Sequence, residues 1–377
     1  SGLYEMYVEG APFEMGVING KLSKELVVRQ EDHFAEQISK MVPSSFQRNY
    51  LKYLIGFFNR NLDDHVTEEY REEIYGVSES ASAKYKYLGS NYQRILNYHA
   101  AHDIGHAVQN LALVGCTSFG TWGAMSQDST MIVGRNFDFY MGDKFSQDKI
   151  VAVFNPSRGH KFMTVTWGGF IGAVSGMNDQ GLSVTINAAK TKLPTGSATP
   201  VSLVTREILQ YAKNIQEAIA IAKSREMFVS ESFLVASAAD NKAVIIEKTP
   251  DDLDVYDPKK NYIVCANHFQ SPRLSKTKMN IGMGNEKAIN QLIAHHSIVF
   301  EPKKLLVWVS TSPWQLGKYV AYDLKKIFAL HGLKENIEVV DSSLTIAPDS
   351  FLVSPAYNNF ILFRTLKQQI LDGGTVN

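Results

Sequence analysis

Cys116 is the residue of this chain whose type and context point most clearly to covalent chemistry. It is one of only two cysteines, it follows Gly115, and it lies about a third of the way along the 377 residues. An internal thiol has a pKa of about 8.5 and is mostly protonated at neutral pH. A cut between Gly115 and Cys116 would place an α-amine, with a pKa of about 7.7–8.0, beside the sulfur as a built-in base. We therefore predict that this cut turns Cys116 into an N-terminal nucleophile.

Charged and amide side chains farther along the chain suit this chemistry. A guanidinium at Arg135 would lower the pKa of the thiol, and a carboxylate at Asp138, three positions later on an expected strand and turn, would orient the new ammonium group. Asn187 and Asn267 follow expected strands, and side-chain amides are suitable donors to an oxyanion. Arg273 is expected to hold either the site or the substrate. The bland interpretation of these residues is an ordinary ion pair and two turn-forming asparagines.

Other histidines allow different hydrolytic chemistry. A Cys-His pair can be drawn with His160 or His268, although neither lies in a context that singles it out. His102 and His106 are four residues apart, which on a helix resembles the H-E-x-x-H zinc motif, with Asp103 in place of the glutamate. A zinc hydrolase is therefore an alternative hypothesis, and an inactive binding protein on the same fold is another.

The cysteine count argues against a disulfide framework or a cysteine-rich zinc site. Cys265 lies in an apolar, strand-like run and is expected to be structural. A Cys116–Cys265 bridge can be drawn on paper, but it would disable the predicted nucleophile.

The composition indicates a folded chain with a large core. Hydrophobic residues make up 45% and aromatic residues 11%, while the formal net charge is zero, which argues against a general nucleic-acid binder. The longest apolar stretch, 162–177, is too short and too β-like for a membrane span. The chain opens at Ser1 without a methionine, which is typical of a processed protein and favours an extracytoplasmic location slightly.

The hydrophobic periodicity changes at Cys116. Residues 1–115 predict a mostly helical leader segment, with an edge strand over 1–9 and helices over 14–42, 46–62, from 67 onward, and 91–113. Residues 116–377 predict a core rich in strands, at 130–133, 150–154, 162–167, 171–175, 181–186, 232–236, 243–248, 253–256, 262–266 and 305–310. Helices are expected over 201–211, 215–223 and 286–296, and either a strand leading into a helix or a single helix over 319–330. This order is typical of an α+β fold, with two sheets packed together and helices outside.

Five segments and one residue, in this order, carry a resemblance to a known family. The chain resembles the cysteine N-terminal-nucleophile (Ntn) hydrolases, specifically the family of acyl-coenzyme A:6-aminopenicillanic acid acyltransferase. It is more distantly similar to penicillin V acylase, bile salt hydrolase and acid ceramidase. The matching pieces are Glu9–Gly16, Gly115–Ser118, Gly134–Asp138, Gly176–Leu182, Asn187 and Asn267–Phe269.

The resemblance implies an Ntn-hydrolase αββα sandwich of two antiparallel sheets, and self-cleavage between Gly115 and Cys116 into a leader and a core. It implies Cys116 as nucleophile, Arg135 and Asp138 as its supporting pair, and Asn267, with Asn187, as oxyanion donors. It also implies a small N-acyl amide as the substrate, cleaved through a thioester, and the apolar aromatic helices of the leader indicate a hydrophobic acyl chain. Whether water or an acceptor amine then takes the acyl group stays open, and no cofactor or metal is required.

Overall fold

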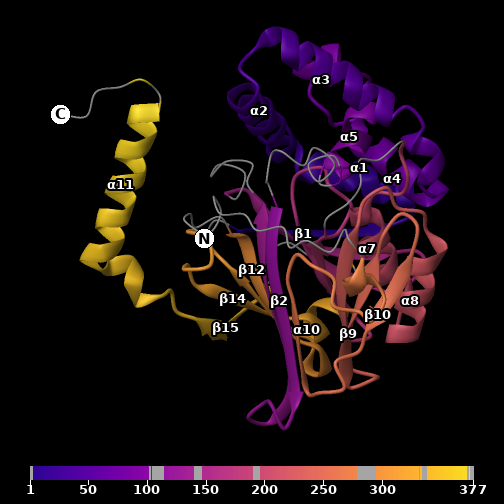
Figure 1. The fold of residues 1–377 in the computed structure, drawn as a ribbon, viewed down its shortest axis with the longest axis vertical. Helices are drawn as coiled ribbons and strands as arrows, with labels where there is room; N and C mark the ends of the chain where they lie inside the picture. The colour runs from indigo at the N-terminus through magenta and orange to yellow at the C-terminus, as the bar shows by residue number, and fades with distance from the viewer. Residues whose placement is uncertain are drawn as a thin grey trace.

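The computed structural model describes residues 3–101, 103, 114–139, 147–189, 196–277, 294–330, 332, 338–371 and 373. The helices are α1 Pro12–Leu22, α2 Lys24–Met41, α3 Ser45–Phe58, α4 Glu68–Ser78, α5 Asn91–His99, α7 Val201–Tyr211, α8 Ile215–Ser224, α10 Leu324–Phe328 and α11 Pro355–Leu371. Helices α1 to α5 lie together at one end of the molecule, and α11 projects to one side (Figure 1). None of the described helices has both the length and the apolar character needed to cross a bilayer.

Fifteen strands form two sheets within the described residues. The first sheet contains β1 Leu3–Gly10, β4 Lys149–Pro156, β5 Phe162–Thr166, β6 Ser175–Asn178, β7 Leu182–Ala188, β8 Glu231–Ser237, β9 Lys242–Lys248 and β10 Leu253–Tyr256, in that spatial order. The second contains β11 Tyr262–Cys265, β2 Val114–Gly123, β3 Ser129–Phe139, β12 Ala294–Glu301, β13 Leu306–Ser310, β14 Tyr319–Asp323 and β15 Val340–Ile346. All neighbours are antiparallel except β1 and β4, which pair in parallel.

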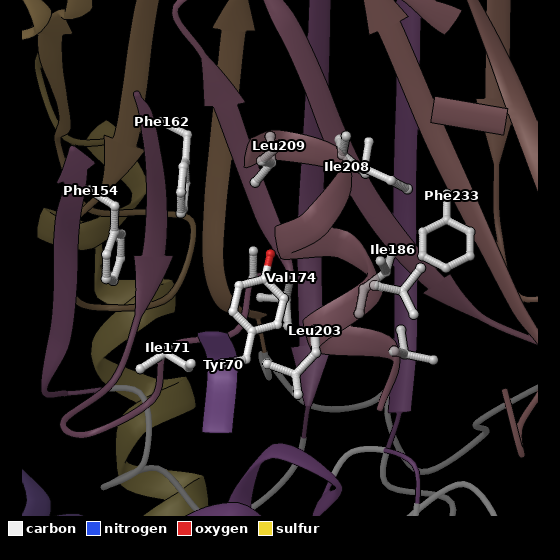
Figure 2. Close-up of a cluster of buried hydrophobic side chains, with 14 of the residues drawn as sticks. Tyr70, Phe154, Phe162, Ile171, Val174, Ile186, Leu203, Ile208, Leu209 and Phe233 are labelled. Atoms are coloured by element: carbon white, nitrogen blue, oxygen red, sulfur yellow. The ribbon is translucent and has the colours of Figure 1, made fainter. Parts of the chain in front are cut away.

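Two apolar cores hold the layers together. One fills the space between the sheets, because alternate residues of each strand face inward; its members include Val133, Val153, Val165, Leu234, Ile245, Ile298 and Val309. The other lies between the eight-stranded sheet and helices of the leader and core (Figure 2). Figure 2 shows Tyr70 of α4 beside strand residues such as Phe154 and Phe162 and α7 residues such as Leu203. The expected α+β architecture of two packed sheets with helices outside is confirmed.

The leader is built into the core rather than attached beside it. Its first strand, β1, forms one edge of the eight-stranded sheet by pairing with β4. Arg206 of α7 bonds both carboxylate oxygens of Glu73 in α4, at 2.9 and 2.7 Å, and both side chains are about 1% exposed. The division at 115/116 therefore stays a prediction about covalent cleavage, since residues on both sides share one sheet.

Two glycines let α1 and α4 approach closely. A Cβ at Gly16 would lie 2.0 Å from the carbonyl oxygen of Glu73, and one at Gly76 would lie 2.4 Å from that of Phe13. No side chain fits at such distances, so the crossing of these helices requires glycine on both. This contact positions α1 against α4 and holds the leader helices as one layer.

Several predicted elements are confirmed and some are wrong. The edge strand, the helix beginning after Thr67 and the helices over 201–211 and 215–223 all form. Of the two alternatives at 319–330, the strand leading into a helix is the one that forms. The helix over 14–42 is divided at Ser23, and the strand expected at 171–175 instead forms at 175–178, because 171–174 serves as a connection. Residues 294–296, expected to end a helix, begin β12, while 286–293 and 104–113 lie outside the described residues.

Candidate active site

Cys116 lies near the start of β2, buried with 3% of its surface exposed. Its backbone N–H donates to the side-chain oxygen of Asn267 at 2.7 Å. Asn267 follows β11, which pairs with β2 in antiparallel register at Cys265 and Ser118, so two more residues bring Asn267 opposite Cys116. The scissile amide nitrogen predicted from the sequence is therefore held by a specific hydrogen bond.

Arg135 is the cation of the site. It lies in β3, which pairs with β2, and its Nη2 is 3.5 Å from the Cys116 Sγ. The guanidinium is fixed by bonds to the carbonyl oxygens of Val174 and Ile186 and to the Ser175 hydroxyl, and it stacks 4.4 Å from the centre of the Phe137 ring. A charged fork held in this way presents one N–H to the sulfur with little freedom to turn elsewhere.

In the uncut chain, burial has the largest effect on the pKa of the Cys116 thiol. It raises the pKa of Cys116 to about 11, while Arg135 acts in the opposite direction and Asp138 in the same direction as burial. The thiol is therefore neutral at pH 7 in this state. A new α-amine beside the sulfur would supply the base that the intact chain lacks.

Asp138 lies directly opposite Gly115 across the β2–β3 pair. It belongs to β3, which runs on to Phe139, so the turn expected near it does not form. Burial raises the pKa of its carboxyl to about 6, and the nearby Arg135 acts to lower it. The carboxyl is therefore beside the bond that we expect to be cut.

The Asp138 carboxyl predicts a pH dependence of stability. Its folded pKa of about 6 lies above the ordinary 3.8, so its contribution to stability is present below pH 3.8 and is lost as the pH rises through 6. We expect Asp138→Asn, made in uncut Cys116→Ala protein, to reduce that loss by up to about 3 kcal/mol. Urea unfolding of both proteins at several pH values measures the free energy of unfolding. If that free energy changes with pH equally in the two proteins, Asp138 is not the group responsible.

Ser175 and His296 support Arg135, and neither had a local signal in the sequence. The hydroxyl of Ser175 accepts from Arg135, and its oxygen lies 3.0 Å from Nε2 of His296. Burial lowers the pKa of His296 well below its usual value and Arg135 acts in the same direction, so the ring is neutral at pH 7. Its neighbour His295 accepts from Trp167 Nε1 at 2.6 Å, and a register shift in β12 lies between Ala294 and His296.

Glu231, at the start of β8, is a second feature that the sequence did not reveal. It is fully buried, neither carboxylate oxygen has a hydrogen-bond partner, and burial raises its pKa well above the ordinary value. It pairs with Ala188 across β7 and β8, and it lies close enough to Cys116 and Arg135 to raise the pKa of both when it is ionised. A carboxyl in this setting is neutral at pH 7.

Asn187 and Arg273 were predicted from the sequence to belong to the site, but their side chains make their contacts with other groups than Cys116. Asn187 accepts from Ser118 at 2.8 Å and donates to the Cys265 carbonyl at 3.2 Å, so it joins the two sheets. Arg273 is 58% exposed, and its side chain pairs with Asp252 at 3.1 Å and with neighbouring groups of β10. The structure brings Cys116, Arg135, Asp138 and Asn267 together and leaves Arg273 on the surface.

The structure bears differently on the other residue sets considered from the sequence: the zinc motif, the Cys-His pairs and the disulfide. His102 and His106 lie outside the described residues; within the described part, no group of three or more His, Cys, Asp or Glu is arranged to hold a metal ion. His160 pairs with Asp179 at 3.3 Å, and His268 is exposed. Cys116 and Cys265 are both free thiols.

A hollow with a cavity volume of about 60 Å³, partly open to solvent, lies near the cysteine. Phe137, directly opposite Cys116, lines it, together with Trp167, Phe170 and Val174 of the core and residues of α2 and α5. Directly opposed residues of paired strands point to the same face. The hollow is therefore on the side of the sheet toward which the thiol points.

The site combines a cysteine at the start of a strand, a guanidinium at its sulfur and a side-chain amide at its backbone nitrogen, all within two packed sheets. This is the class of site expected for an Ntn hydrolase or acyltransferase. The model of one family, acyl-coenzyme A:6-aminopenicillanic acid acyl-transferase, matches residues 125–306, just under half of the chain. This match confirms the expected resemblance to that family, and with the fold it supports the Ntn-hydrolase and acyltransferase class.

The related proteins have low sequence identity to this chain. The chain is 24% identical over 315 residues to an uncharacterized protein of Archaeoglobus fulgidus, covering 74% of this chain and 52% of that protein. It is 24% identical over 388 residues to protein dcd1B of Dictyostelium discoideum, covering 96% of this chain and 74% of the relative. Thus the chain spans only about half the length of the archaeal relative.

Similar solved structures include an acid amidase, an acylase and a bile acid hydrolase. An N-acylethanolamine-hydrolyzing acid amidase ortholog of Caenorhabditis elegans has 21% identity and a TM-score of 0.36, covering 50% of this chain and 93% of that one. Penicillin V acylase from Agrobacterium tumefaciens has 11% identity and a TM-score of 0.35, covering 56% and 87%. A mutant conjugated bile acid hydrolase from Clostridium perfringens has 12% identity and a TM-score of 0.38, covering 60% and 96%.

Proposed function

We propose that this chain cuts itself between Gly115 and Cys116 and then uses Cys116 to cleave the amide bond of small N-acyl substrates. The observation that carries the proposal is the geometry at Cys116: Arg135 Nη2 lies 3.5 Å from Sγ, and the Asn267 oxygen accepts from the backbone nitrogen at 2.7 Å. One contact suits a thiolate and the other suits an amine at the same residue.

Self-cleavage begins with attack of the Cys116 sulfur on the Gly115 carbonyl carbon. A thioester forms as the carbon–nitrogen bond breaks, and the thiol proton passes to the departing nitrogen. Water then hydrolyses the thioester, which leaves a carboxylate on Gly115 and a free thiol and amine on Cys116. Asn267 holds the nitrogen throughout, and Asp138, opposite Gly115, lies beside the bond being cut.

The substrate reaction repeats this chemistry with an outside amide. The new α-amine takes the thiol proton, the sulfur attacks the substrate carbonyl, and the amine returns the proton to the departing amine of the substrate. Arg135 favours the thiolate. Asn267 donates one hydrogen of its side-chain amide to the Ala188 carbonyl at 2.7 Å in the uncut chain, and the second hydrogen of that nitrogen is the one that would serve the oxyanion. Water finishes the reaction as a hydrolysis, or an acceptor amine finishes it as a transfer.

The apolar hollow beside Phe137 suits the acyl side of the substrate. Its walls are mainly aromatic and aliphatic, and it opens on the side of the sheet where the thiol lies. Burying an acyl chain there stabilises the complex by about 0.8 kcal/mol per methylene. The proposed substrate class is therefore an amide whose acyl group is largely apolar.

Production of the full chain tests the proposal. Wild-type protein is expected to give two pieces, residues 1–115 and 116–377, on a denaturing gel and by intact mass, while Cys116→Ala stays whole and inactive. Because β1 and the Glu73–Arg206 pair join leader and core, the two pieces are expected to elute together under native conditions.

Cys265→Ala is the matched control, since its thiol is fully buried and free and has no proposed role in catalysis. It is expected to be cut like wild type. A wild-type chain that stays whole and inactive under all conditions would contradict the proposal. Activity that is lost together with stoichiometric zinc would favour the metal hydrolase instead.

A further inference from the structure

The C-terminal helix α11 projects from the body of the molecule (Figure 1). Trp314, which lies between β13 and β14, holds its near face. The Phe360 ring lies edge-on to the Trp314 indole, with 6.4 Å between the ring centres, and the Arg364 guanidinium lies 4.8 Å from the centre of the same indole. With 17 residues, α11 is about 25 Å long. It is therefore an arm that is anchored on one face and extends into solvent.

The face of α11 turned away from Trp314 is apolar. A helix with 3.6 residues per turn brings four large apolar side chains together on that face: Leu362, Phe363, Leu366 and Ile370. Leu362, Phe363 and Ile370 are 55, 63 and 60% exposed. Large apolar side chains that are grouped and exposed in this way mark an interaction surface. A partner for α11 must therefore offer an apolar lining.

The charge of α11 narrows the partner further. Residues 350–371 include two cations, Arg364 and Lys367, and no aspartate or glutamate. Arg364 is stacked on Trp314, whereas Lys367 is exposed beside the apolar face and makes no ion pair with any residue that the structure describes. The surface that receives α11 should therefore be acidic as well as apolar.

A groove with both properties lies on the same chain, between α10 and the first residues of β15. Its cavity volume is about 340 Å³, and it is open to solvent. Four of its lining residues are apolar and four are charged: Ile327, Leu330, Val339 and Val340, and Asp323, Lys326, Glu338 and Asp341. Lys326 pairs with Asp323 at 3.2 Å and lies 3.8 Å from Asp341. Glu338 is exposed and has no ion pair within the described ranges, so the groove keeps a net negative charge.

The arm and the groove lie at opposite ends of β15, so a chain does not fill its own groove. Val340, at the groove, begins the strand and pairs with Tyr322, whereas Ile346 ends the strand toward α11 and pairs with Tyr319. The seven residues between these ends span about 20 Å, and α11 continues away from the body (Figure 1). A second copy related by a two-fold axis would bring its groove to this arm and its own arm to this groove.

We propose that the chain forms a two-fold dimer in which the apolar face of α11 of each copy lies in the groove between α10 and β15 of the other. The stripe with Phe363 at its centre packs against the apolar lining of the groove, and Lys367 of one copy pairs with Glu338 of the other. The contact forms twice, which closes the assembly at two chains because both surfaces of each copy are used. This dimer does not depend on the chemistry at Cys116.

Sedimentation equilibrium of the full chain tests the dimer. Cys116→Ala protein is used so that the chain stays whole, and its expected mass is that of two chains. Phe363→Asp places a charge on the apolar stripe and is expected to give single chains with an unchanged circular dichroism spectrum, since Phe363 is 63% exposed. Phe46→Asp is the matched control, because Phe46 is 81% exposed on α3 and should leave the dimer intact. A parent that stays a single chain at all concentrations, or a Phe363→Asp protein that dimerises like its parent, overturns the proposal.

Charge reversal tests the groove. Lys367→Glu and Glu338→Lys each place like charges at both contacts of the dimer, so each is expected to raise the dissociation constant about tenfold or more. An equal mixture of the two variants should regain the parent value, because each contact of the mixed dimer then has one charge of each sign. Lys223→Glu on α8 changes the net charge equally and should leave the constant unchanged. A mixture that stays as weak as the single variants, or an equal loss in Lys223→Glu, overturns the assignment of the groove.

Discussion

Arg135→Met is expected to lower kcat/KM of the cut enzyme by between about tenfold and a thousandfold. An opposite charge within hydrogen-bond reach lowers a pKa by about 1–3 units, and Arg135 is the cation on the Cys116 sulfur. Without it, the thiol pKa rises and the thiolate fraction at fixed pH falls by the same factor. The rate of alkylation by iodoacetamide as a function of pH measures the thiol pKa directly.

Two further variants accompany Arg135→Met: Arg135→Lys as the conservative replacement and Arg225→Met as the distant control. Lysine keeps the charge but not the fork that bonds Val174, Ser175 and Ile186, so an intermediate loss is expected. Arg225, paired with Glu207 away from Cys116, should change neither the thiol pKa nor kcat/KM. An unchanged alkylation profile in Arg135→Met would show that the guanidinium does not act on the thiol.

Arg206→Met is expected to destabilise the protein by about 3–5 kcal/mol. It leaves the Glu73 carboxyl about 1% exposed in a site where burial already raises its pKa and only Arg206 opposes that effect. The guanidinium also lies over the rings of Tyr70, Phe154 and Phe162, at 5.1, 4.7 and 5.2 Å from their centres, so packing is lost as well. Urea unfolding of uncut Cys116→Ala protein gives the change.

Arg225→Met again supplies the comparison. Its pair with Glu207 has the same shortest distance, 2.7 Å, but Arg225 is 32% exposed, and such pairs contribute about 0–1 kcal/mol. Restoring a neutral partner in the double variant Glu73→Gln, Arg206→Met should recover part of the loss. Equal effects of Arg206→Met and Arg225→Met would mean that the buried pair does not join leader to core.

The sequence was sufficient to predict which side chains gather around Cys116, because they lie in ordered short motifs. Cys116, Arg135, Asp138 and Asn267 come together in space as expected, through the pairing of β2 with β3 and β11. Their chemical roles stay predictions. Arg273 shows the limit of reasoning from spacing, since six residues beyond Asn267 the chain has already turned toward the acidic groups of β10.

The groups that support these residues had no comparable signal. Ser175, His296 and Glu231 come from strands that are distant in sequence, and only the packing of two sheets brings their side chains to Arg135 and Cys116. Gln30 looked like any polar residue on an amphipathic helix. Its lack of a partner becomes visible only when α2 is placed against the core.

Strand and helix types were predicted well where periodicity was strong and poorly where glycine interrupted it. Gly172 lies within the strand that was expected at 171–175, and Gly176 lies within the strand that forms at 175–178. A Cβ at Gly176 would lie 2.5 Å from the Met163 carbonyl, so this position is set by close contact between strands rather than by side-chain alternation. Likewise, nothing in 1–9 indicated that β1 would pair in parallel with β4, some 140 residues later.

The parallel β1–β4 pair has a consequence for refolding once the chain is cut. In the precursor, this edge strand returns to its sheet as part of one molecule, and the cost of closing the loop grows only slowly with its length. After the cut, the same strand belongs to a separate polypeptide, and its return becomes a second-order association that depends on concentration. Cleavage at Gly115–Cys116 would therefore make folding effectively one-way: the finished enzyme keeps the structure its precursor built but, once diluted and unfolded, regains it slowly.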